Sequence, residues 1–360
     1  MLHKDQAALR AEGRRCLIET VPGRLAGRLR RLTRGRRGLL LLDHAFRVEA
    51  EEWRDALPSF SLAFTARRGE AAKSWGEAHR LLTKMAEAGL ARDDWLVVRG
   101  GGSLSDLGAF CAGLYRRGLR LILVTTTLLG AVDAAVGGKT ALNFGGAKNQ
   151  VGHFYLPERV LVDLAAFQSL SRAQLAEGLA EAYKTGLLFD RSLADLVDQR
   201  SEELLAGNQE LLAEAARRSF QAKAALVAQD FREEKGLREV LNLGHTYGHA
   251  AEAHIGLSHG RAVALGLAVA AELSRDLAGF PADEAARLKK VCLRLGGPWP
   301  PPVPEGEARR LFKADKKIRN GRLRFVALAA VERPIIMEVS ADDILNAAAR
   351  VIAGESCPIS

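Results

Sequence analysis

The chain has 360 residues, enough for two domains with separate cores, and its 48% hydrophobic and 26% charged residues are usual for a soluble globular protein. No apolar run approaches the length of a membrane span, so we expect no membrane partner. The N-terminus has no secretory leader pattern, so we expect a cytoplasmic protein. The four scattered cysteines lack metal-type spacing, and we expect them to be reduced thiols. The net charge of +9 permits an anionic small molecule. Much of it comes from Arg24, Arg28, Arg30, Arg31, Arg34, Arg36 and Arg37, which lack interleaved aromatics and a nucleic-acid module, so we expect a solvated basic face and no nucleic-acid partner.

The first half of the chain alternates short apolar runs with helical stretches, as an α/β domain does. Residues 39–42 predict a buried strand that ends at Asp43, and residues 71–88 predict a helix. A strand at 95–98 runs into three glycines, and a helix at 107–116 follows. Further strands are expected at 121–124 and 160–163.

The second half repeats apolar residues at helical spacing from about residue 171 onward. Helices are expected at 172–188, 210–229, 246–254, 262–277 and 282–295. A proline-rich break at 297–302 precedes a hairpin-like segment at 323–328. The layout indicates an α/β domain followed by a mostly helical domain, with a cleft between them as the expected site.

A glycine run, Gly100 to Gly102, lies between a predicted strand and a predicted helix. Glycines at such a turn let the backbone approach a pyrophosphate, and the helix N-terminus favours its negative charge. Asp43, at the end of an earlier strand, is suited to a ribose diol. The residues alone leave a tight turn and a helix cap open as alternatives.

Two glycine–lysine segments follow, at 137–140 and 146–149. Glycines beside lysines indicate a loop that places ammonium groups on phosphate or carboxylate oxygens. The spacing excludes a Walker loop. An ordinary surface loop would explain the lysines, but not the accompanying Asp133 and Asn149.

The most informative segment carries four of the eight histidines: His245, His249, His254 and His259. His245 and His249 are four residues apart, so a helix would place them on one face, where they can share a metal or a substrate. Two imidazoles and a carboxylate suit a divalent cation that polarises a substrate oxygen. A helix packed through half-buried histidines is the alternative.

Together these segments resemble the 3-dehydroquinate synthase family of sugar-phosphate cyclases. Matching residues extend from Asp43 through the stretch 69–73 to the stretch 315–317, and the most specific ones lie at 132–140, 178–184 and 236–249. The resemblance implies a Rossmann-like NAD-binding α/β domain at 1–168 and an all-α metal- and substrate-binding domain at 169–360. It also implies a homodimer.

By matching position, the resemblance implies bound NAD and a divalent metal, zinc or cobalt. The implied metal ligands are Glu181, His245 and His259, which moves His249 from ligand to substrate neighbour and leaves His254 without a role. The implied NAD-binding residues are Asp43, Glu70, Lys73, Gly101, Gly102, Ser103, Asp106, Thr126, Thr127, Lys148, Ser169 and Leu170. The implied substrate-binding and catalytic residues are Arg117, Asp133, Lys139, Asn149, Lys184, Lys223, Arg238, Asn242, His249, Lys316 and Lys317.

The implied reaction converts 3-deoxy-D-arabino-heptulosonate 7-phosphate to 3-dehydroquinate and phosphate, in the shikimate pathway that leads to chorismate and the aromatic amino acids. It passes through transient oxidation by NAD, β-elimination of phosphate, re-reduction and an intramolecular aldol step. Holding a polyanionic sugar phosphate requires several lysines and arginines.

Five residues depart from the family pattern: Ser103, Ser105, Thr125, Ser171 and, two residues after a predicted ligand, Arg261. They keep three alternatives open. These are another cyclase such as an aminodehydroquinate synthase, an oxidoreductase related to glycerol dehydrogenase, and a non-catalytic paralogue.

Overall fold

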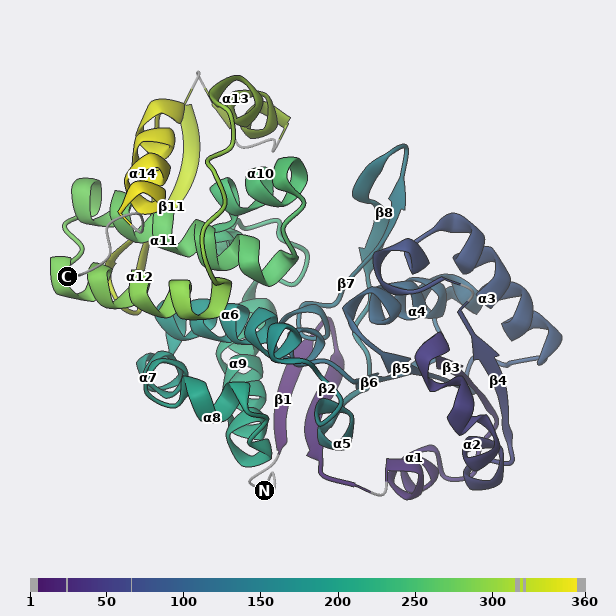
Figure 1. Cartoon of the computed structure of the whole chain (residues 1–360). Helices are drawn as coiled ribbons and strands as arrows, with labels where there is room; N and C mark the ends of the chain where they lie inside the picture. Colours follow the sequence, from purple (N-terminus) through teal and green to yellow (C-terminus); the bar gives the residue numbers. More distant parts are fainter. Residues whose placement is uncertain (1–5, 24, 66, 315–317, 320–321, 355–360) are drawn as a thin grey trace. The chain divides into compact units, whose positions relative to one another are not determined.

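A computed structural model describes residues 6–23, 25–65, 67–314, 318–319 and 322–354. The chain forms two compact units (Figure 1). Unit 1 comprises Met1–Ser171 and Ala206–Glu234, and unit 2 comprises Arg172–Leu205 and Lys235–Ser360. The expected division at 168/169 placed the stretch 206–234 in the second domain. It groups with unit 1 because its helix α9 (Gln209–Gln229) packs against β1 and β2.

Unit 1 is built on a seven-stranded sheet in the order β1-β2-β9-β6-β5-β3-β4. Only the β1–β2 pair is antiparallel, and β2 continues the parallel part beside β9. The buried strands β3, β5, β6 and β9 are the continuous apolar runs expected from the sequence. The strands are β1 (Gln6–Ala11), β2 (Arg14–Val21), β3 (Gly38–Leu42), β4 (Phe60–Phe64), β5 (Trp95–Gly100), β6 (Arg120–Thr125) and β9 (Arg159–Asp163).

Helices cover both faces of this sheet (Figure 1). On one face, Leu29 and Trp53 from α1 and α2 join Leu40, Val97 and Ile122 in a buried cluster. On the other face α4 packs on β5 and β6, with α3 beside it. The helical segments of unit 1, besides α9, are α1 (Leu25–Thr33), η1 (His44–Glu49), α2 (Ala50–Ala56), η2 (Gly69–Ala72), α3 (Trp75–Glu87), α4 (Gly102–Leu114), η3 (Tyr115–Arg117), η4 (Gly130–Ala134) and α5 (Leu164–Phe167).

The two glycine–lysine segments form a β-hairpin rather than the expected loop. Strands β7 (Lys139–Phe144) and β8 (Ala147–Phe154) pair antiparallel and extend away from the main sheet (Figure 1). Gly145 and Gly146 both have positive φ at the tip, where glycine is favoured. Lys139 opens the first strand, and Lys148 and Asn149 lie in the second.

Unit 2 is helical around α11, which is buried along nearly its whole length and contacts α6, α10, α12 and α14. A three-stranded antiparallel sheet of β10, β11 and β12 lies beside it, which includes the hairpin-like segment. Its elements are α6 (Arg172–Phe189), α7 (Arg191–Gln199), α8 (Ser201–Leu205), η5 (Leu237–Asn242), α10 (His245–Ile255), α11 (His259–Ala278), α12 (Ala282–Gly296), α13 (Glu305–Ala314), β10 (Ile318–Arg319), β11 (Arg322–Ala330), β12 (Arg333–Val339) and α14 (Ala341–Ala353).

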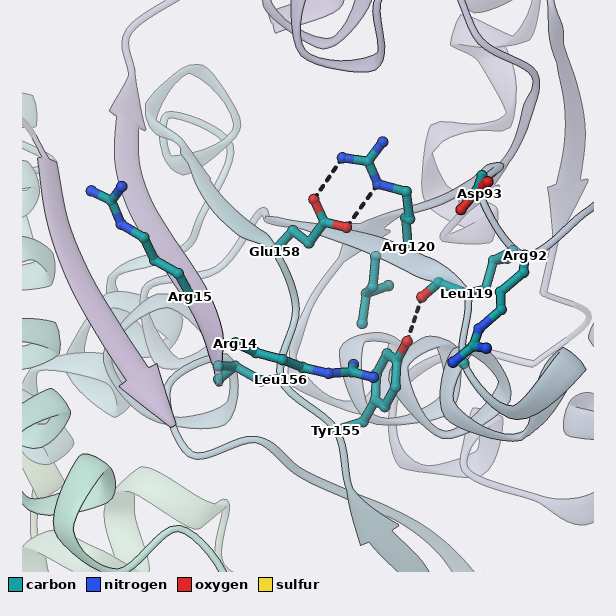
Figure 2. A pocket seen from close by; sticks show the side chains of 11 residues that line it. Arg14, Arg15, Arg92, Asp93, Leu119, Arg120, Tyr155, Leu156 and Glu158 are labelled. Atoms are coloured by element: carbon teal, nitrogen blue, oxygen red, sulfur yellow. Dashed lines mark hydrogen bonds and ion pairs between the residues drawn. The ribbon is translucent and has the colours of Figure 1, made fainter. Parts of the chain in front are cut away.

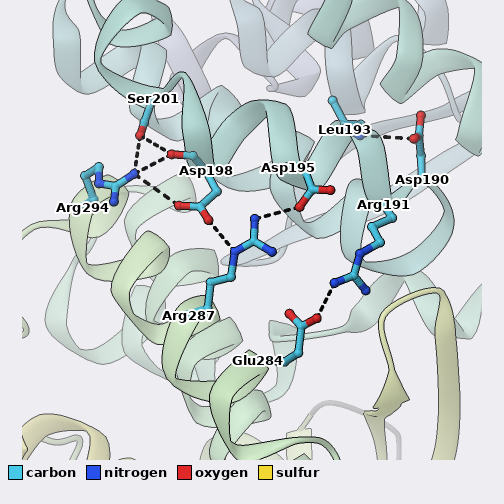
Figure 3. A network of polar contacts seen from close by, with 9 residues as sticks. All are labelled: Asp190, Arg191, Leu193, Asp195, Asp198, Ser201, Glu284, Arg287 and Arg294. Atoms are coloured by element: carbon cyan, nitrogen blue, oxygen red, sulfur yellow. Dashed lines mark hydrogen bonds and ion pairs between the residues drawn. The ribbon is translucent and has the colours of Figure 1, made fainter.

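An ion-pair network joins α7 to α12 at the surface of unit 2 (Figure 3). Arg287 donates to Asp195 at 2.7 Å and to Asp198 at 2.6 Å, and Arg294 donates to the Asp198 carbonyl at 2.8 Å. Because both arginines belong to α12 and bind oxygens of α7, the network holds α7 against α12. None of the helices in the described part of the chain has the length and hydropathy of a membrane span.

Candidate metal and cofactor sites

The three predicted metal ligands converge in unit 2 from three helices. Glu181 lies on α6, His245 begins α10 and His259 begins α11. One ligand atom from each residue lies within 4.8 Å of the others. The Glu181 side chain is fully buried, and its Oε1 lies 3.4 Å from the Nε2 atoms of both histidines.

The His245 ring is held with Nε2 directed at Glu181. Its Nδ1 lies 3.1 Å from the carbonyl of Leu243, and a carbonyl only accepts, so Nδ1 carries the proton. Burial and the nearby Lys184 ammonium lower the pKa of His245 well below its ordinary value, although Glu181 opposes them. A neutral ring protonated at Nδ1 leaves the Nε2 lone pair available to a metal.

The His259 ring is oriented by a carboxylate that the sequence analysis did not single out. Glu252 Oε2 lies 3.1 Å from His259 Nδ1, while His259 Nε2 faces Glu181. A carboxylate behind a metal-binding histidine fixes the tautomer and raises the basicity of the ligating nitrogen. Glu252 is seven residues after His245, two helical turns along one face, and that spacing is the signal that would have found it.

Glycines allow the ligand-bearing helices to approach closely. A Cβ on Gly260 would lie 2.2 Å from Glu177 Cα, so α11 meets the backbone of α6 there. A Cβ on Gly266 would lie 1.8 Å from the carbonyl oxygen of Gly244, just before α10. These contacts set the spacing of the helices that carry Glu181, His245 and His259.

This donor set fits a divalent cation. Two imidazole nitrogens and one carboxylate leave positions open for a substrate oxygen, as in catalytic zinc sites. Two nitrogen lone pairs facing one buried carboxylate oxygen repel each other unless a cation lies among them. Lys184 places its Nζ 2.7 Å from Glu181 Oε2 and 3.5 Å from His245 Nε2, at the edge of the group.

The remaining histidines lie outside the ligand group. The His249 ring is 5.0 Å from the His245 ring at 78°, so the two are neighbours, but His249 is not among the converging atoms. His254 Nδ1 instead lies 4.0 Å from Glu307. Of the other predicted substrate residues in unit 2, Arg238 is buried and Asn242 is half-buried, both in η5. Lys316 and Lys317 lie outside the described residues.

Arg261, the cation that departs from the family pattern, has carbonyl partners. Its Nε donates to the Gly296 carbonyl at 2.7 Å and its Nη2 to the Pro298 carbonyl at 3.0 Å. The guanidinium therefore ties the start of α11 to the end of α12 and to the segment that follows it. That gives Arg261 a structural role that does not require it to approach the ligands.

Predicted NAD-binding residues of unit 1 lie at the carboxyl ends of parallel strands. Asp43 follows β3, Gly101 and Gly102 follow β5, and Thr126 and Thr127 follow β6. The chain runs from β3 outward to β4 and then returns to β5 on the other side of β3, so the strand order reverses here. Ligands of open α/β sheets bind at such a point. Gly102 also begins the 13-residue helix α4, whose N-terminus favours a phosphate.

Asp43 also caps η1, because its side chain accepts a hydrogen bond from the Ala45 amide at 2.9 Å. The cap, left open by the sequence, is therefore present. It uses Oδ1 and does not exclude a ribose contact by the other oxygen. The last two predicted NAD-binding residues, Ser169 and Leu170, follow α5.

A polar cluster gathers five predicted residues beside α4. Lys73 is buried and donates to Asp106 at 2.6 Å and to Asn149. Glu70 accepts from Ser103 at 3.0 Å. Burial raises the pKa of Asp106 to about 6, although Lys73 opposes the shift. The serine that departs from the family pattern thus has a defined partner.

Predicted substrate residues of unit 1 form a second set of ion pairs. Lys223 on α9 donates to Asp133 at 2.6 Å, and Lys139 pairs with Glu233 at 2.5 Å. Arg117 is exposed and has φ of 61°, in the left-handed region. Sequence patterning did not predict the approach of Lys223 to Asp133, since they lie 90 residues apart.

Comparison with known proteins decides the family. The family model described as 3-dehydroquinate synthase N-terminal matches residues 63–177, and the C-terminal model matches residues 178–318. This chain belongs to the 3-dehydroquinate synthase family. A curated 3-dehydroquinate synthase from Haemophilus ducreyi is 38% identical over 290 residues, which are 78% of this chain and 79% of that protein.

Several solved structures share the fold of this chain. The 2-epi-5-epi-valiolone synthase of Streptomyces hygroscopicus, with NAD+ and Zn2+ bound, is 25% identical with a TM-score of 0.84, over 94% of this chain and 96% of that one. A 2-deoxy-scyllo-inosose synthase with carbaglucose-6-phosphate, NAD+ and Co2+ is 22% identical with a TM-score of 0.85, over 97% and 99%. A probable glycerol dehydrogenase from Sinorhizobium meliloti, at 16% identity and TM-score 0.63 over 94% and 97%, shares the fold less closely.

Proposed function

We propose that this member of the family is a 3-dehydroquinate synthase, a carbon–oxygen lyase that converts 3-deoxy-D-arabino-heptulosonate 7-phosphate to 3-dehydroquinate and phosphate. The observation that carries the proposal is the convergence of Glu181, His245 and His259 from three helices in a chain of this family. NAD and a divalent cation, which relatives hold, are the proposed cofactors.

When bound, NAD supplies reversible hydride transfer and the cation acidifies a substrate hydroxyl. Glu181, His245 and His259 would hold the cation, and Glu252 would orient His259. Lys184, buried with its Nζ near Glu181 Oε2, is placed to hold or donate a proton there.

The other charged residues would bind the anionic substrate. We assign the substrate carboxylate to Arg238, since a buried guanidinium recognises a carboxylate with two parallel hydrogen bonds. The lysines Lys139 and Lys223, with Asn149, provide donors suited to a phosphate. We assign NAD to the carboxyl edge of the unit 1 sheet, with Gly101 and Gly102 near its pyrophosphate.

The direct test is phosphate release from 3-deoxy-D-arabino-heptulosonate 7-phosphate by purified protein with NAD and Zn2+. We expect release that requires both additions and is lost in Glu181→Gln, while Glu307→Gln, which changes a carboxylate outside the ligand group, retains it. Absence of phosphate release from folded, metal-loaded protein would reject the proposal.

A related cyclase activity is the second candidate, because the two solved cyclases with TM-scores of 0.84 and 0.85 have other products in their names. Glucose 6-phosphate carries no carboxylate, and a carba-analogue of it is bound in one of them. Release of phosphate from glucose 6-phosphate, and not from the keto acid phosphate, would favour that candidate.

Two predictions from the sequence complete the proposal: a cytoplasmic location and a homodimer. Cell fractionation tests the first. Light scattering of the purified protein tests the second, and a monomeric mass across the working concentration range would overturn it.

A further inference from the structure

Unit 1 carries two arginine-lined hollows that the lyase proposal does not use. The larger, of about 380 Å³, is lined by Arg14, Arg15, Arg92 and Arg120, with Asp93 and Glu158 among its other residues (Figure 2). The smaller, of about 250 Å³, is lined by Arg34, Arg36 and Arg159 and shares Arg120 and Glu158 with the first. We call them the amino-end hollows.

Both hollows lie at the amino ends of the parallel strands. Arg14 begins β2, Arg120 begins β6 and Arg159 begins β9, whereas Arg92 precedes β5 by a short turn. The predicted NAD-binding residues follow the carboxyl ends of the same strands. The amino-end hollows are therefore at the opposite edge of the sheet from those residues, and a ligand there would not compete with NAD.

The larger hollow holds more positive charge than its carboxylates neutralise. Arg120 is used internally: it donates to both oxygens of Glu158 at 2.8 Å and stacks over Trp95 at 3.8 Å. Arg14 lies over the Tyr155 ring at 4.7 Å. Within the described ranges, neither Arg14 nor Arg92 has a carboxylate within ion-pair distance, and Figure 2 shows both side chains directed toward Tyr155.

The smaller hollow adds to this charge. Arg34 and Arg36 belong to the N-terminal arginine cluster, for which the proposed lyase gives no role. Burial is the main cause that lowers the pKa of Arg159, and the guanidinium groups of Arg28 and Arg15 lower it further, although Glu19 and Glu158 oppose the shift.

We propose that the amino-end hollows bind a small molecule with two phosphate groups, one group in each hollow. Guanidinium groups that come from separate strands and turns can donate to several phosphate oxygens at once. The two hollows adjoin at Arg120 and Glu158, and each has further arginines of its own, which suits two linked anionic groups. Tyr155 and Trp95 are the aromatic residues lining the hollows, and arginines already cover both rings, so neither offers a face on which a nucleic-acid base could stack.

The test is calorimetric titration of the NAD- and metal-loaded protein with fructose 1,6-bisphosphate, compared with inorganic phosphate. We expect wild-type protein to bind the bisphosphate more tightly than inorganic phosphate. The double variant Arg14→Gln/Arg92→Gln should weaken bisphosphate binding by at least about tenfold, because it removes two charged donors. Arg34→Gln/Arg36→Gln should weaken it as well.

Arg54→Gln is the matched control, because Arg54 is an exposed arginine of unit 1 on α2, outside both hollows. Its affinity should equal that of the wild type, and lyase turnover without bisphosphate should be unchanged in all variants. Equal loss in Arg54→Gln would mean unspecific charge attraction and would overturn the proposal. So would wild-type affinity in both double variants, or bisphosphate binding no tighter than phosphate. Arg92→Gln alone, at an exposed turn, serves if a double variant does not fold.

Discussion

Glu252 contacts His259 and is not one of the three converging ligands. Replacing it therefore tests the orientation of a ligand while all three ligands remain. Glu252→Ala should lower zinc affinity about tenfold to a hundredfold, and Glu252→Gln, which keeps an acceptor oxygen, by less. Competition with a chromophoric chelator measures this without relying on turnover. Glu307→Ala, which removes the carboxylate beside the non-ligand His254, should leave zinc affinity unchanged. Equal affinities in wild type and Glu252→Ala would show that His259 needs no such support.

Arg238 is buried, and we propose that the substrate carboxylate pairs with its guanidinium charge. Arg238→Ala should lower kcat/KM for the keto acid phosphate by about a hundredfold, mainly through KM, because a buried charged hydrogen bond is lost. Arg238→Lys should recover little, since an ammonium cannot reproduce the two parallel bonds. An unchanged specificity constant in Arg238→Ala, with an unchanged melting temperature, would contradict carboxylate recognition there.

Asp106 gives a pH dependence with a defined sign. Burial raises the pKa of Asp106 from 3.8 to about 6. Between these two values, the folded protein holds a proton that the unfolded chain has already released. Its contribution to stability is therefore complete below the ordinary value of 3.8 and is lost as pH rises toward 6. Relative to Asp106→Asn, which cannot ionise, the wild-type melting temperature should fall between about pH 4 and about pH 7. A pH-independent difference between the two proteins would show that the carboxyl is not perturbed.

At the scale of elements, the helix packing that brings the ligands together depends on glycines. Gly260→Ala adds a Cβ where the backbone of Glu177 on α6 stands, so α11 must shift. We expect a loss of about 1–3 kcal/mol in the free energy of unfolding and weaker zinc binding, although no ligand is changed. Gly306→Ala on α13 has open space and should be neutral or stabilising. Zinc affinity unaffected by Gly260→Ala would show that the helix spacing is adjustable.

The spacing of apolar residues predicted the strands and helices that carry a single strong hydrophobic pattern. The buried strands β3, β5, β6 and β9 and the helices α6, α9, α10, α11 and α12 were expected close to their observed bounds. The β1–β2 pair and the β7–β8 hairpin were missed, because β2 begins with two arginines and β8 is mostly exposed and polar. Neither has the apolar run by which the buried strands were found.

Residue spacing alone was a weaker guide to the site. It favoured His245 and His249 as a ligand pair, because helical periodicity shows which residues share a face. It cannot show which helices cross, and the crossing of α6, α10 and α11 is what groups Glu181 and His259 with His245. The resemblance to a family supplied that set, whereas the contact of Glu252 required the structure.

At the scale of the whole molecule, we propose that the sheet of unit 1 binds NAD and the helices of unit 2 bind the metal within one lyase. The proposed lyase differs from the dehydrogenase alternative in its stoichiometry, because NAD, when bound, would be regenerated in each cycle. Substoichiometric NAD should therefore suffice for complete conversion.

Phosphate release and nicotinamide absorbance, followed together during turnover of 3-deoxy-D-arabino-heptulosonate 7-phosphate with Zn2+, test this most directly. The proposed lyase reaction yields one phosphate for each 3-dehydroquinate formed, with no steady accumulation of NADH. Accumulation of NADH in proportion to substrate consumed, without phosphate release, would contradict it.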